Sequence, residues 1–523
     1  MVADFDLVVV GSGFAGSLIS MIACRLGYRV ALVERGRHPR FAIGESTTPL
    51  ANLILEELSL TYDLPALIPL TQWGSWQRVY PGLGCGLKRG FSFFHHRAGS
   101  RRTFGANREH QLMVAASPRD EIADTHWYRA DLDHFLSLEA QRSGAEYLEA
   151  WQPTGLELGP TGGVLVGESH GHVQRLSFRR LIDASGGGVG GSCVTRLLQL
   201  GVDPLEGFPV TRTLYAHFRN IPRWSELHPS SEPTPYPVDD SAMHHVFDEG
   251  WFWVLRFANG LTSAGVVMTD AAPLAPGLKP THSSWTELLT RFPQISEHLG
   301  PGIPEGAFHQ QSVVGFRGRH AVAGPCVLLP SAVGFVDPMF STGFPLTLLG
   351  VERLAMAISG GGLGSEFEGT LGCYERQTVS ELNLTAKFMG AAYRLFPDFD
   401  SFRSLSMLYF TAAIYSETVR RLGKPELASG FLLADHPVFG RALAHCLEIA
   451  GTVPPRVFAD QVRRAIEPFE LAGLMNPEAQ HWYRASAQPM LEGAAKVGVS
   501  PDEMQSMLER VGFHQAHGVN PPL

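Results

Sequence analysis

The first 34 residues carry the clearest pattern of hydrophobic and polar positions in the chain. Residues 5–10 form an apolar, valine-rich run that is typical of a buried parallel strand. Apolar residues then recur at helical spacing over residues 18–26, and residues 29–33 form a second short strand that ends at Glu34. The pattern therefore predicts a complete strand–helix–strand unit at the N-terminus.

Further along the chain, the pattern alternates between strands and helices. A strand is predicted at 179–184, and residues 242–268 alternate as strands of an antiparallel sheet do. Helices are predicted at 127–144 and 345–358, and most of 371–523 is expected to be helical with proline breaks. The chain is thus predicted to have an α/β fold with a helical C-terminal region.

Composition narrows the class of protein. The 523 residues carry a formal net charge of −9, which provides no positive field for nucleic acid, so we expect no nucleic-acid partner. The six cysteines lie far apart without a C-x-x-C pair, which predicts no metal site and favours a reducing, cytoplasmic location. Residues 7–24 are uncharged, but glycines interrupt them, so we expect a buried strand and helix and no membrane span. The 56 glycines gather in clusters, as expected where backbone approaches a large ligand.

One of these glycine clusters lies in the N-terminal unit. The segment Gly11-Ser12-Gly13-Phe14-Ala15-Gly16 joins the first strand to the helix. Such glycines allow a tight turn and let a pyrophosphate approach the helix N-terminus, where free N–H groups favour negative charge. Glu34, at the end of the next strand, is placed to accept hydrogen bonds from ribose hydroxyls. The motif predicts binding of FAD or NAD.

Five further segments resemble flavin-dependent halogenases and their FAD-dependent monooxygenase relatives. Residues 40–49 read R-F-A-I-G-E-S-T-T-P, similar to a segment that follows the dinucleotide unit in that family. Residues 128–133, 181–186 and 334–343 resemble its FAD-contacting segments, and Lys88 lies where the family keeps a lysine. The ordered set favours FAD over NAD, and Phe340, where tryptophan halogenases have an acidic residue, points to the phenol and pyrrole branch.

The resemblance implies a fold and a set of cofactor-binding residues. It implies a Rossmann-like FAD-binding domain formed by residues 1–70, 105–195 and 305–365, with the fold of flavoprotein monooxygenases. An inserted antiparallel substrate-side sheet would comprise 71–104 and 196–304, followed by the helical region 366–523. The cofactor-binding residues it implies are Gly11, Gly13, Phe14, Ala15, Gly16, Glu34, Arg35, Glu45, Ser46, Arg129, Asp183, Gly186, Asp337 and Gly343.

The resemblance also implies a reaction. In the family, reduced FAD (FADH₂) and O₂ give a flavin hydroperoxide, a chloride or bromide ion converts it to hypohalous acid, and a lysine relays the halogen to an aromatic ring. Thr342 and Gly343 would bind the halide through backbone N–H groups, although Ser341-Thr342-Gly343 could instead only cap the following helix. The substrate would be phenolic or pyrrolic, free or bound to a carrier protein. A separate flavin reductase would be needed, because no second nicotinamide motif is present.

Lys88 is the predicted catalytic residue. Glycines at 82, 84, 86 and 90 flank it and an apolar run follows, so we expect it on a strand edge facing a cavity. The alternative is an ordinary surface lysine. An aromatic set could line a cavity for an aryl substrate or could be ordinary core; it comprises Trp73, Trp76, Tyr80, Phe91, Phe93 and Phe94.

Three departures from the family pattern leave a second function open. Trp251 and Trp253 match a W-x-W-x-I-P motif thought to keep substrate from the flavin, but Arg256 replaces its proline, and both tryptophans could be strand core. Ser331 and Pro330 replace the family's aspartate and glycine, and Phe340 replaces the acidic residue. The alternatives are an FAD-dependent monooxygenase or reductase that does not halogenate, and a partner-binding protein with structural FAD. The pairs His95-His96 and His244-His245 should diverge on strands, and we expect no G-x-S-x-G nucleophile elbow for Ser-His-Asp chemistry.

Overall fold

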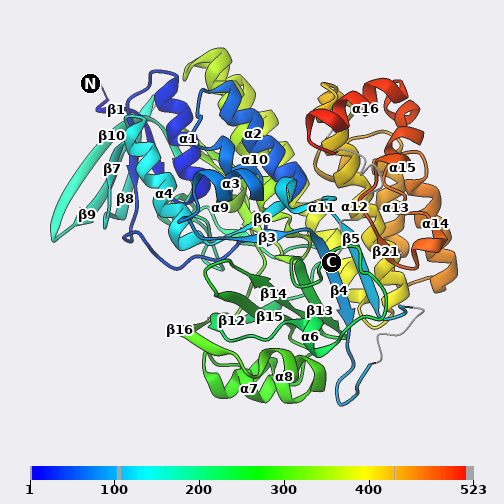
Figure 1. The fold of residues 1–523 in the computed structure, drawn as a ribbon. Helices are drawn as coiled ribbons and strands as arrows, with labels where there is room; N and C mark the ends of the chain where they lie inside the picture. Colours follow the sequence, from blue (N-terminus) through cyan, green and yellow to red (C-terminus); the bar gives the residue numbers. More distant parts are fainter. Residues whose placement is uncertain (1–2, 103–107, 160, 429, 514–523) are drawn as a thin grey trace.

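The N-terminal unit builds a parallel sheet in the computed structural model, which describes residues 3–102, 108–159, 161–428 and 430–513 (Figure 1). The strand order is β18-β19-β10-β1-β2-β7, and all pairs except β18–β19 are parallel. Residues Leu7 to Val10 of β1 are buried, as its apolar sequence predicts. The bounds are β1 (Phe5–Val10), β2 (Val30–Val33), β7 (Glu146–Leu148), β10 (His172–Asp183), β18 (Val322–Ala323) and β19 (Cys326–Leu328); β8 (Gln152–Gly159) and β9 (Gly162–Ser169) extend β10 as an antiparallel hairpin.

Helices pack around this sheet. α1 (Phe14–Arg25) contacts α4 (Arg129–Arg142) and α10 (Gly343–Gly361), and α10 contacts α2 (Pro49–Thr61). The helices predicted at 127–144 and 345–358 are therefore present, with α4 slightly shorter and α10 slightly longer than expected. The shorter helices are α3 (Trp73–Val79), α5 (Cys193–Leu197), α6 (Trp224–Leu227) and α9 (Pro330–Val333).

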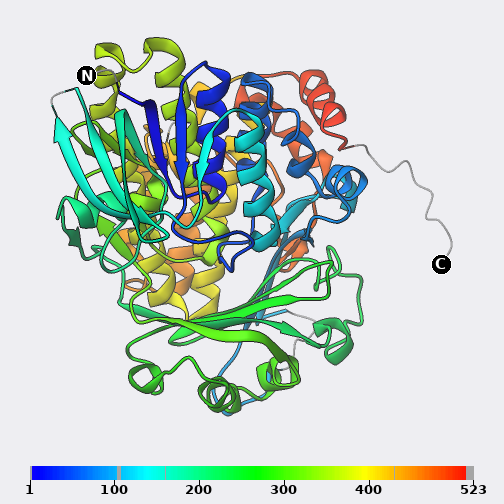
Figure 2. The ribbon, with the colours of Figure 1, turned by 90° about the vertical axis from the view of Figure 1, so that its left-hand side faces the viewer.

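A second, mostly antiparallel sheet lies below the parallel sheet in Figure 2. Its order is β16-β12-β15-β14-β13-β4-β5-β21, and only β13–β4 and β5–β21 are parallel. Helices α7 (His282–Thr290) and α8 (Pro293–Leu299) bury Trp285 and Phe292 against it. The bounds are β4 (Gly90–His95), β5 (Gln111–Ala115), β12 (Thr211–Arg219), β13 (Ala242–Phe247), β14 (Gly250–Arg256), β15 (Thr262–Thr269), β16 (Ile303–Gln311) and β21 (Trp482–Tyr483).

Three strands of this sheet come wholly or mostly from segments predicted to belong elsewhere, and most of β16 falls within 305–365, which we assigned to the FAD-binding domain. β5 falls within 105–195, which we assigned to the FAD-binding domain, and β21 falls within the C-terminal region. Hydrogen bonding to β4 places β5 in the substrate-side sheet, and short strands such as β21 carry too few residues for a periodic signal. The division into domains otherwise stays a prediction.

Small strand pairs join the two large sheets. β3 (Cys85–Lys88) pairs antiparallel with β6 (Asp124–Trp127), and Ser46 forms a bridge to His126. A three-stranded sheet combines β11 (Val202–Asp203), β17 (Phe316–Gly318) and β20 (Gly334–Phe335). These small sheets bring the segment after β2, strand β3 and the loop before α10 toward one another.

The C-terminal region is helical, as predicted, and flanks both sheets (Figure 1). α11 and α12 are its long helices, and α12 packs against α2 and α14. None of the helices built from the described residues combines the length and hydrophobicity needed to cross a membrane. The bounds are α11 (Ser365–Leu395), α12 (Phe399–Arg421), α13 (Phe439–Ile449), α14 (Pro455–Ile466), α15 (Ala487–Glu492) and α16 (Pro501–Arg510).

The turn between β1 and α1 depends on a close backbone approach. A Cβ atom added at Gly16 would lie 1.8 Å from the Gly11 carbonyl oxygen. We expect Gly16→Ala to lower the free energy of unfolding by about 1–3 kcal/mol or more, because the strand and helix would have to separate. Gly360→Ala, at an exposed helical position where a Cβ meets nothing within 4 Å, should be neutral or slightly stabilising. Thermal unfolding of both variants tests this, and equal melting temperatures would contradict it.

Candidate active site

The glycine turn and Glu34 form the nucleotide end of the site. Gly13 precedes α1 without a side-chain cap, so the helix N-terminus is left to backbone N–H groups. Glu34 accepts hydrogen bonds from the Ser12 and Gly36 amides (3.1 and 2.9 Å) and from Arg40 Nη2 (3.3 Å). Burial acts to raise the pKa of Glu34, but Arg40 and these hydrogen bonds outweigh it and lower the pKa. Glu34 therefore stays ionised.

The loop after β2 carries buried polar atoms that no described residue satisfies. They include Arg40 Nε, Glu45 Oε2 and Ser46 Oγ. Buried polar groups in native proteins almost always have partners, so these atoms indicate a polar ligand in this region. The glycine turn, the ionised Glu34 and this set together fit a dinucleotide such as FAD.

Other predicted cofactor residues lie around the glycine turn and the neighbouring loops, and their contact with the cofactor stays a prediction. Arg129 forms a bidentate ion pair with Asp133 (2.8 Å for both contacts) and donates to the Gly44 carbonyl (2.9 Å). It therefore fixes the loop after β2, which contains Glu45 and is called the Glu45 loop below, to α4. Asp183 is fully buried and accepts hydrogen bonds from the Ser185 and Val194 amides. Phe14 contacts the rings of Trp127 and Phe344. A Cβ atom added at Gly186 would meet no atom within 4 Å, and Arg35 is exposed.

The loop before α10 has a strained backbone. Phe340 and Ser341 both adopt positive φ (60° and 56°), which non-glycine residues rarely do, and strain of this kind gathers at functional sites. Tyr409 of α12 donates to the Phe340 carbonyl (2.6 Å) and holds this conformation. Thr342 makes no side-chain capping bond to any described residue, and the halide-binding role of Thr342 and Gly343 stays a prediction. The first turn of α10, which begins at Gly343, has no acidic residue, and its dipole favours an anion.

Asp337 connects this loop to the paired tryptophans. Its carboxylate accepts from the Met339 amide (2.9 Å) and the Tyr393 hydroxyl (2.8 Å), and Tyr393 accepts from Trp251 Nε1 (3.2 Å). Burial raises the pKa of Asp337 to about 6. Trp253 donates to Ser263 (3.1 Å), and both tryptophans are buried on one face of β14. Their gating role stays a prediction.

The three departures from the family pattern have separate places in the fold. Arg256 donates to the Ile221 carbonyl (3.1 Å) and pairs with Asp239 (3.3 Å), so it fastens the long loop before β13. Pro330 and Ser331 lie in α9, where Pro330 packs against Gly350 of α10. Phe340 packs among rings of β4, α11 and α12. At position 340 of the loop before α10, the packing of an aromatic ring thus replaces the acidic residue of the tryptophan halogenases.

Lys88 ends β3 and is completely buried. Its Nζ donates to the Thr47 carbonyl and lies 3.9 Å from the centre of the Phe91 ring. Burial lowers the pKa of Lys88, and the nearby Asp124 opposes this effect. The surface-lysine alternative is therefore wrong. The strand edge is as predicted.

Asp124 is a site residue that the sequence did not reveal. It faces Lys88 in the β3–β6 ladder and is fully buried. Oδ1 accepts a hydrogen bond from Asn52 (2.8 Å), whereas Oδ2 has no partner among the described residues. Burial raises the pKa of Asp124. Only the antiparallel pairing of β3 and β6 brings the two charged residues together.

A cavity of about 130 Å³ lies beside Lys88, and we call it the aryl cavity. Phe91 both lines it and contacts Nζ, whereas Lys88 is not a lining residue, so Phe91 separates the lysine from this cavity. Tyr409, which holds the α10 loop, is part of the wall. Most of the wall comes from α12 and the C-terminal segment, including Phe410, Glu417, Arg421, Leu474, Met490 and Phe513.

The predicted aromatic set does not form one cluster. Phe91 lines the aryl cavity and Phe93 packs beside it against Phe340, whereas Phe94 faces the opposite core. Trp76 is buried in the core around α3. Alternation along β4 separates Phe93 from Phe94, so the set divides between two cores.

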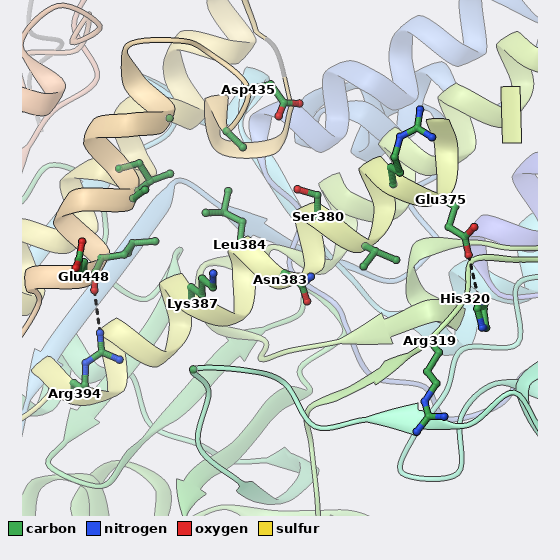
Figure 3. A pocket seen from close by; sticks show the side chains of 18 residues that line it. Arg319, His320, Glu375, Ser380, Asn383, Leu384, Lys387, Arg394, Asp435 and Glu448 are labelled. Atoms are coloured by element: carbon green, nitrogen blue, oxygen red, sulfur yellow. Dashed lines mark hydrogen bonds and ion pairs between the residues drawn. The ribbon is translucent and has the colours of Figure 1, made fainter. Parts of the chain in front are cut away.

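A larger hollow of about 1000 Å³ lies between α11 and α13 (Figure 3). The labelled charged side chains that line it are Arg319, Glu375, Lys387, Arg394, Asp435 and Glu448. None of the predicted site residues lines it. Size alone therefore does not identify the reaction site in this fold.

The histidine pairs diverge within each pair but meet across strands. His96 Nε2 lies 3.0 Å from His245 Nδ1, and His245 Nε2 lies 3.1 Å from His298 Nδ1. Burial lowers the pKa values of all three, so they are neutral. Among the described residues, no group of three or more His, Cys, Asp or Glu side chains could hold a metal ion.

Comparison with known proteins assigns the family. The tryptophan halogenase family model matches residues 122–402, more than half of the chain, and the protein belongs to this family. The chain is similar to the monodechloroaminopyrrolnitrin halogenase PrnC of Pseudomonas fluorescens, with 26% identity over 79% of this chain and 72% of that protein. It is 28% identical to the tetracycline 7-halogenase of Kitasatospora aureofaciens over 66% of this chain and 61% of that enzyme.

Solved structures agree with the fold. Halogenase PltM in complex with phloroglucinol and FAD superposes with a TM-score of 0.80, at 22% identity, over 91% of this chain and 99% of that one. The predicted fold class and the predicted enzyme class, a flavin-dependent halogenase, are confirmed. The family model ends within α12, so most of the aryl cavity wall lies beyond the matched residues.

Tyr393 provides a test of the link between Asp337 and Trp251. Tyr393→Phe should lower the free energy of unfolding by about 1–3 kcal/mol, because a buried carboxylate loses its donor. The pKa of Asp337 lies above its ordinary value, so the stability of the folded protein falls as pH rises from that ordinary value to the raised one. Loss of the Tyr393 hydrogen bond raises the pKa of Asp337 further. The defect should therefore be larger at pH 8 than at pH 5 in urea unfolding. Tyr28→Phe, at a half-buried tyrosine, is the control, and a pH-independent defect would contradict the assignment.

Proposed function

We propose that the protein halogenates one electron-rich aromatic ring, phenolic or pyrrolic, using reduced FAD, O₂ and chloride or bromide. The observation that carries the proposal is the position of Lys88. Its buried Nζ contacts the ring of Phe91, which is also a wall of the aryl cavity. A lysine in such a place has no solvent to interact with, and its halogen-bearing form would be one side chain away from a bound ring.

The nucleotide end would hold FAD through Gly11, Gly13, Gly16, Glu34 and the polar atoms of the Glu45 loop. Bound FAD, reduced and reacting with O₂, supplies the oxidising equivalent for the halide. The helix N-terminus at Thr342 and Gly343 would hold the halide through backbone N–H groups, since the first turn carries no competing carboxylate. The strained turn at Phe340 and Ser341 keeps those groups aimed at one position.

Lys88 would relay the halogen. Its neutral amine attacks the halogen of hypohalous acid, so that an N–halogen bond forms, the O–halogen bond breaks, and the hydroxide leaves with an amine proton as water. Because Phe91 covers the lysine, its side chain must first move aside; the ring then takes the halogen from nitrogen and returns a proton to the nitrogen. Burial favours this chemistry because it lowers the pKa of Lys88 and so raises the amine fraction.

The aryl cavity limits the substrate. Apolar cavities of about 150 Å³ hold one benzene ring, and this cavity is similar in size. Its polar end contains Glu417, which pairs with Arg421 one turn along α12 (2.8 Å). A phenolic O–H or a pyrrolic N–H could donate to Glu417, which would take the proton as the ring gains positive charge.

Other partners follow from the reaction. A separate flavin reductase would supply reduced FAD. One relative, from Pseudomonas fluorescens, is named as a 1H-pyrrole-2-carbonyl-[peptidyl-carrier protein] chlorinase, so carrier-bound rings join free ones as candidate substrates. A second function, oxygenation without halide, is favoured by Arg256 at the position of the family's proline.

Bromide dependence tests the proposed function. Single-turnover oxidation of the protein loaded with reduced FAD should yield brominated phenol only when bromide is present. Lys88→Met, which keeps the length and buried volume of the side chain, should retain flavin oxidation and lose at least about 10²-fold of bromination. Hydrogen peroxide as the only product with and without bromide would contradict halogenation, and hydroxylated phenol would support the oxygenase.

Glu417 tests the substrate assignment. Glu417→Gln should lower kcat/KM for phenol by about 10²-fold, because the base is lost while the shape is kept. 2-Naphthol, with two rings, should be a far poorer substrate than phenol. Glu139→Gln, which breaks a comparable helical pair with Arg142 on α4, is the control. Unchanged bromination of phenol by Glu417→Gln would exclude Glu417 as the base.

A further inference from the structure

The carboxylate of Asp124 has one satisfied and one unsatisfied oxygen in a fully buried position. Burying such a group is costly unless it has a task or a partner. The β3–β6 ladder fixes it directly opposite Lys88, the buried lysine of the proposed relay. The Asp124 carboxylate therefore lies where its charge acts on the buried lysine.

A hydrogen-bond network holds the pair in register. Asn52 of α2 donates both to Asp124 Oδ1 (2.8 Å) and to Thr47 Oγ1 (3.2 Å). Thr47 Oγ1 donates to the Thr125 carbonyl (2.8 Å), and the Thr47 carbonyl accepts from Lys88. One rigid set of bonds thus positions both members of the pair, which a chance buried carboxylate would not require.

The other charged or titratable groups around the pair leave Asp124 as the main charge that acts on Lys88. His126 of β6 and His244 of β13 are neutral, because burial lowers the pKa of each to about 3. From α12, Glu417 and Arg421 act on Asp124, but they neutralise each other at 2.8 Å. Tyr409 hydrogen-bonds to the Phe340 carbonyl.

We propose that Asp124 is a positioning residue that sets the charge state of Lys88, because the β3–β6 ladder holds its carboxylate opposite the buried ammonium. Lys88 Nζ donates to the Thr47 carbonyl and Asp124 Oδ1 accepts from Asn52, and no hydrogen bond or ion pair joins the two described side chains, so the carboxylate acts on Lys88 through its charge. The inference rests on the proposed relay. Burial supports it, because it lowers the pKa of Lys88 and raises that of Asp124 toward each other.

The lysine content of the chain makes a direct test feasible. The protein has five lysines, namely Lys88, Lys279, Lys387, Lys424 and Lys496, all among the described residues, and of these only Lys88 is buried. Lysine-labelled protein without flavin should show five side-chain NMR signals, and the one missing in Lys88→Met should titrate at the lowest pH. In Asp124→Asn that signal should titrate at least about one pH unit lower, because the opposing charge is gone.

Controls separate this inference from the proposed function. Asp460→Asn, at an exposed carboxylate on α14, should leave the Lys88 titration unchanged. Asn52→Ala keeps the Asp124 carboxylate but removes its donor, which raises the pKa of Asp124. Asn52→Ala should therefore lower the pKa of Lys88 by less than Asp124→Asn does. It replaces Asp124→Asn in the test if that variant does not fold. Equal Lys88 titration in wild type and both variants would overturn the inference, even if bromination occurs.

The pH profile of bromination gives the second readout. In Asp124→Asn, the limb that reports Lys88 should move to lower pH with KM for phenol unchanged, since Asp124 does not line the aryl cavity. A uniform loss of rate without a shift of the limb would mark a merely structural role. Absence of bromination in wild type, with the NMR shift present, would overturn the proposed function and leave the pair intact.

Discussion

The burial of one ammonium group constrains the whole site. Lys88 Nζ has a carbonyl, an aromatic face and a nearby carboxylate around it, and no exposed surface. In a low-dielectric surrounding these few groups decide its charge and direction. Each comes from a different element: Thr47 precedes α2, Phe91 lies on β4 and Asp124 lies on β6. The β3–β6 pair must therefore hold its register, because a slip of one residue would turn Lys88 to the other face of the strand.

A second chain of contacts joins the loop before α10 to the antiparallel sheet and the long C-terminal helices. Asp337, Tyr393 and Trp251 are linked by two hydrogen bonds across a loop, α11 and β14. Tyr409 of α12 fixes the Phe340 carbonyl and also forms part of the aryl cavity wall. The strained turn is thus held from both sides, which keeps the proposed halide position and the cavity in a fixed relation.

The aryl cavity depends on the part of the chain that the family model does not cover. The matched residues end at 402, whereas α12 and residues 472–513 supply most of the wall. The glycine turn and Lys88 also lie outside the matched residues, and in the proposed function they serve the cofactor and the halogen. In the proposed function, the C-terminal helices limit which ring can enter the aryl cavity, because they supply most of its wall.

The sequence by itself determined the class of fold, the nucleotide unit and the lysine. The valine-rich β1, the glycine turn and Glu34 are local features. The apolar run of a strand, the backbone freedom of glycine and a carboxylate at the end of a strand all depend on neighbours along the chain. Lys88 could be found from its motif, but its complete burial could not. The membership of β5 in the antiparallel sheet, the meeting of Asp124 with Lys88, and the wall formed by Glu417 and Phe513 were decided only by the tertiary structure. These contacts join residues tens to hundreds of positions apart, and no local periodicity encodes such pairings.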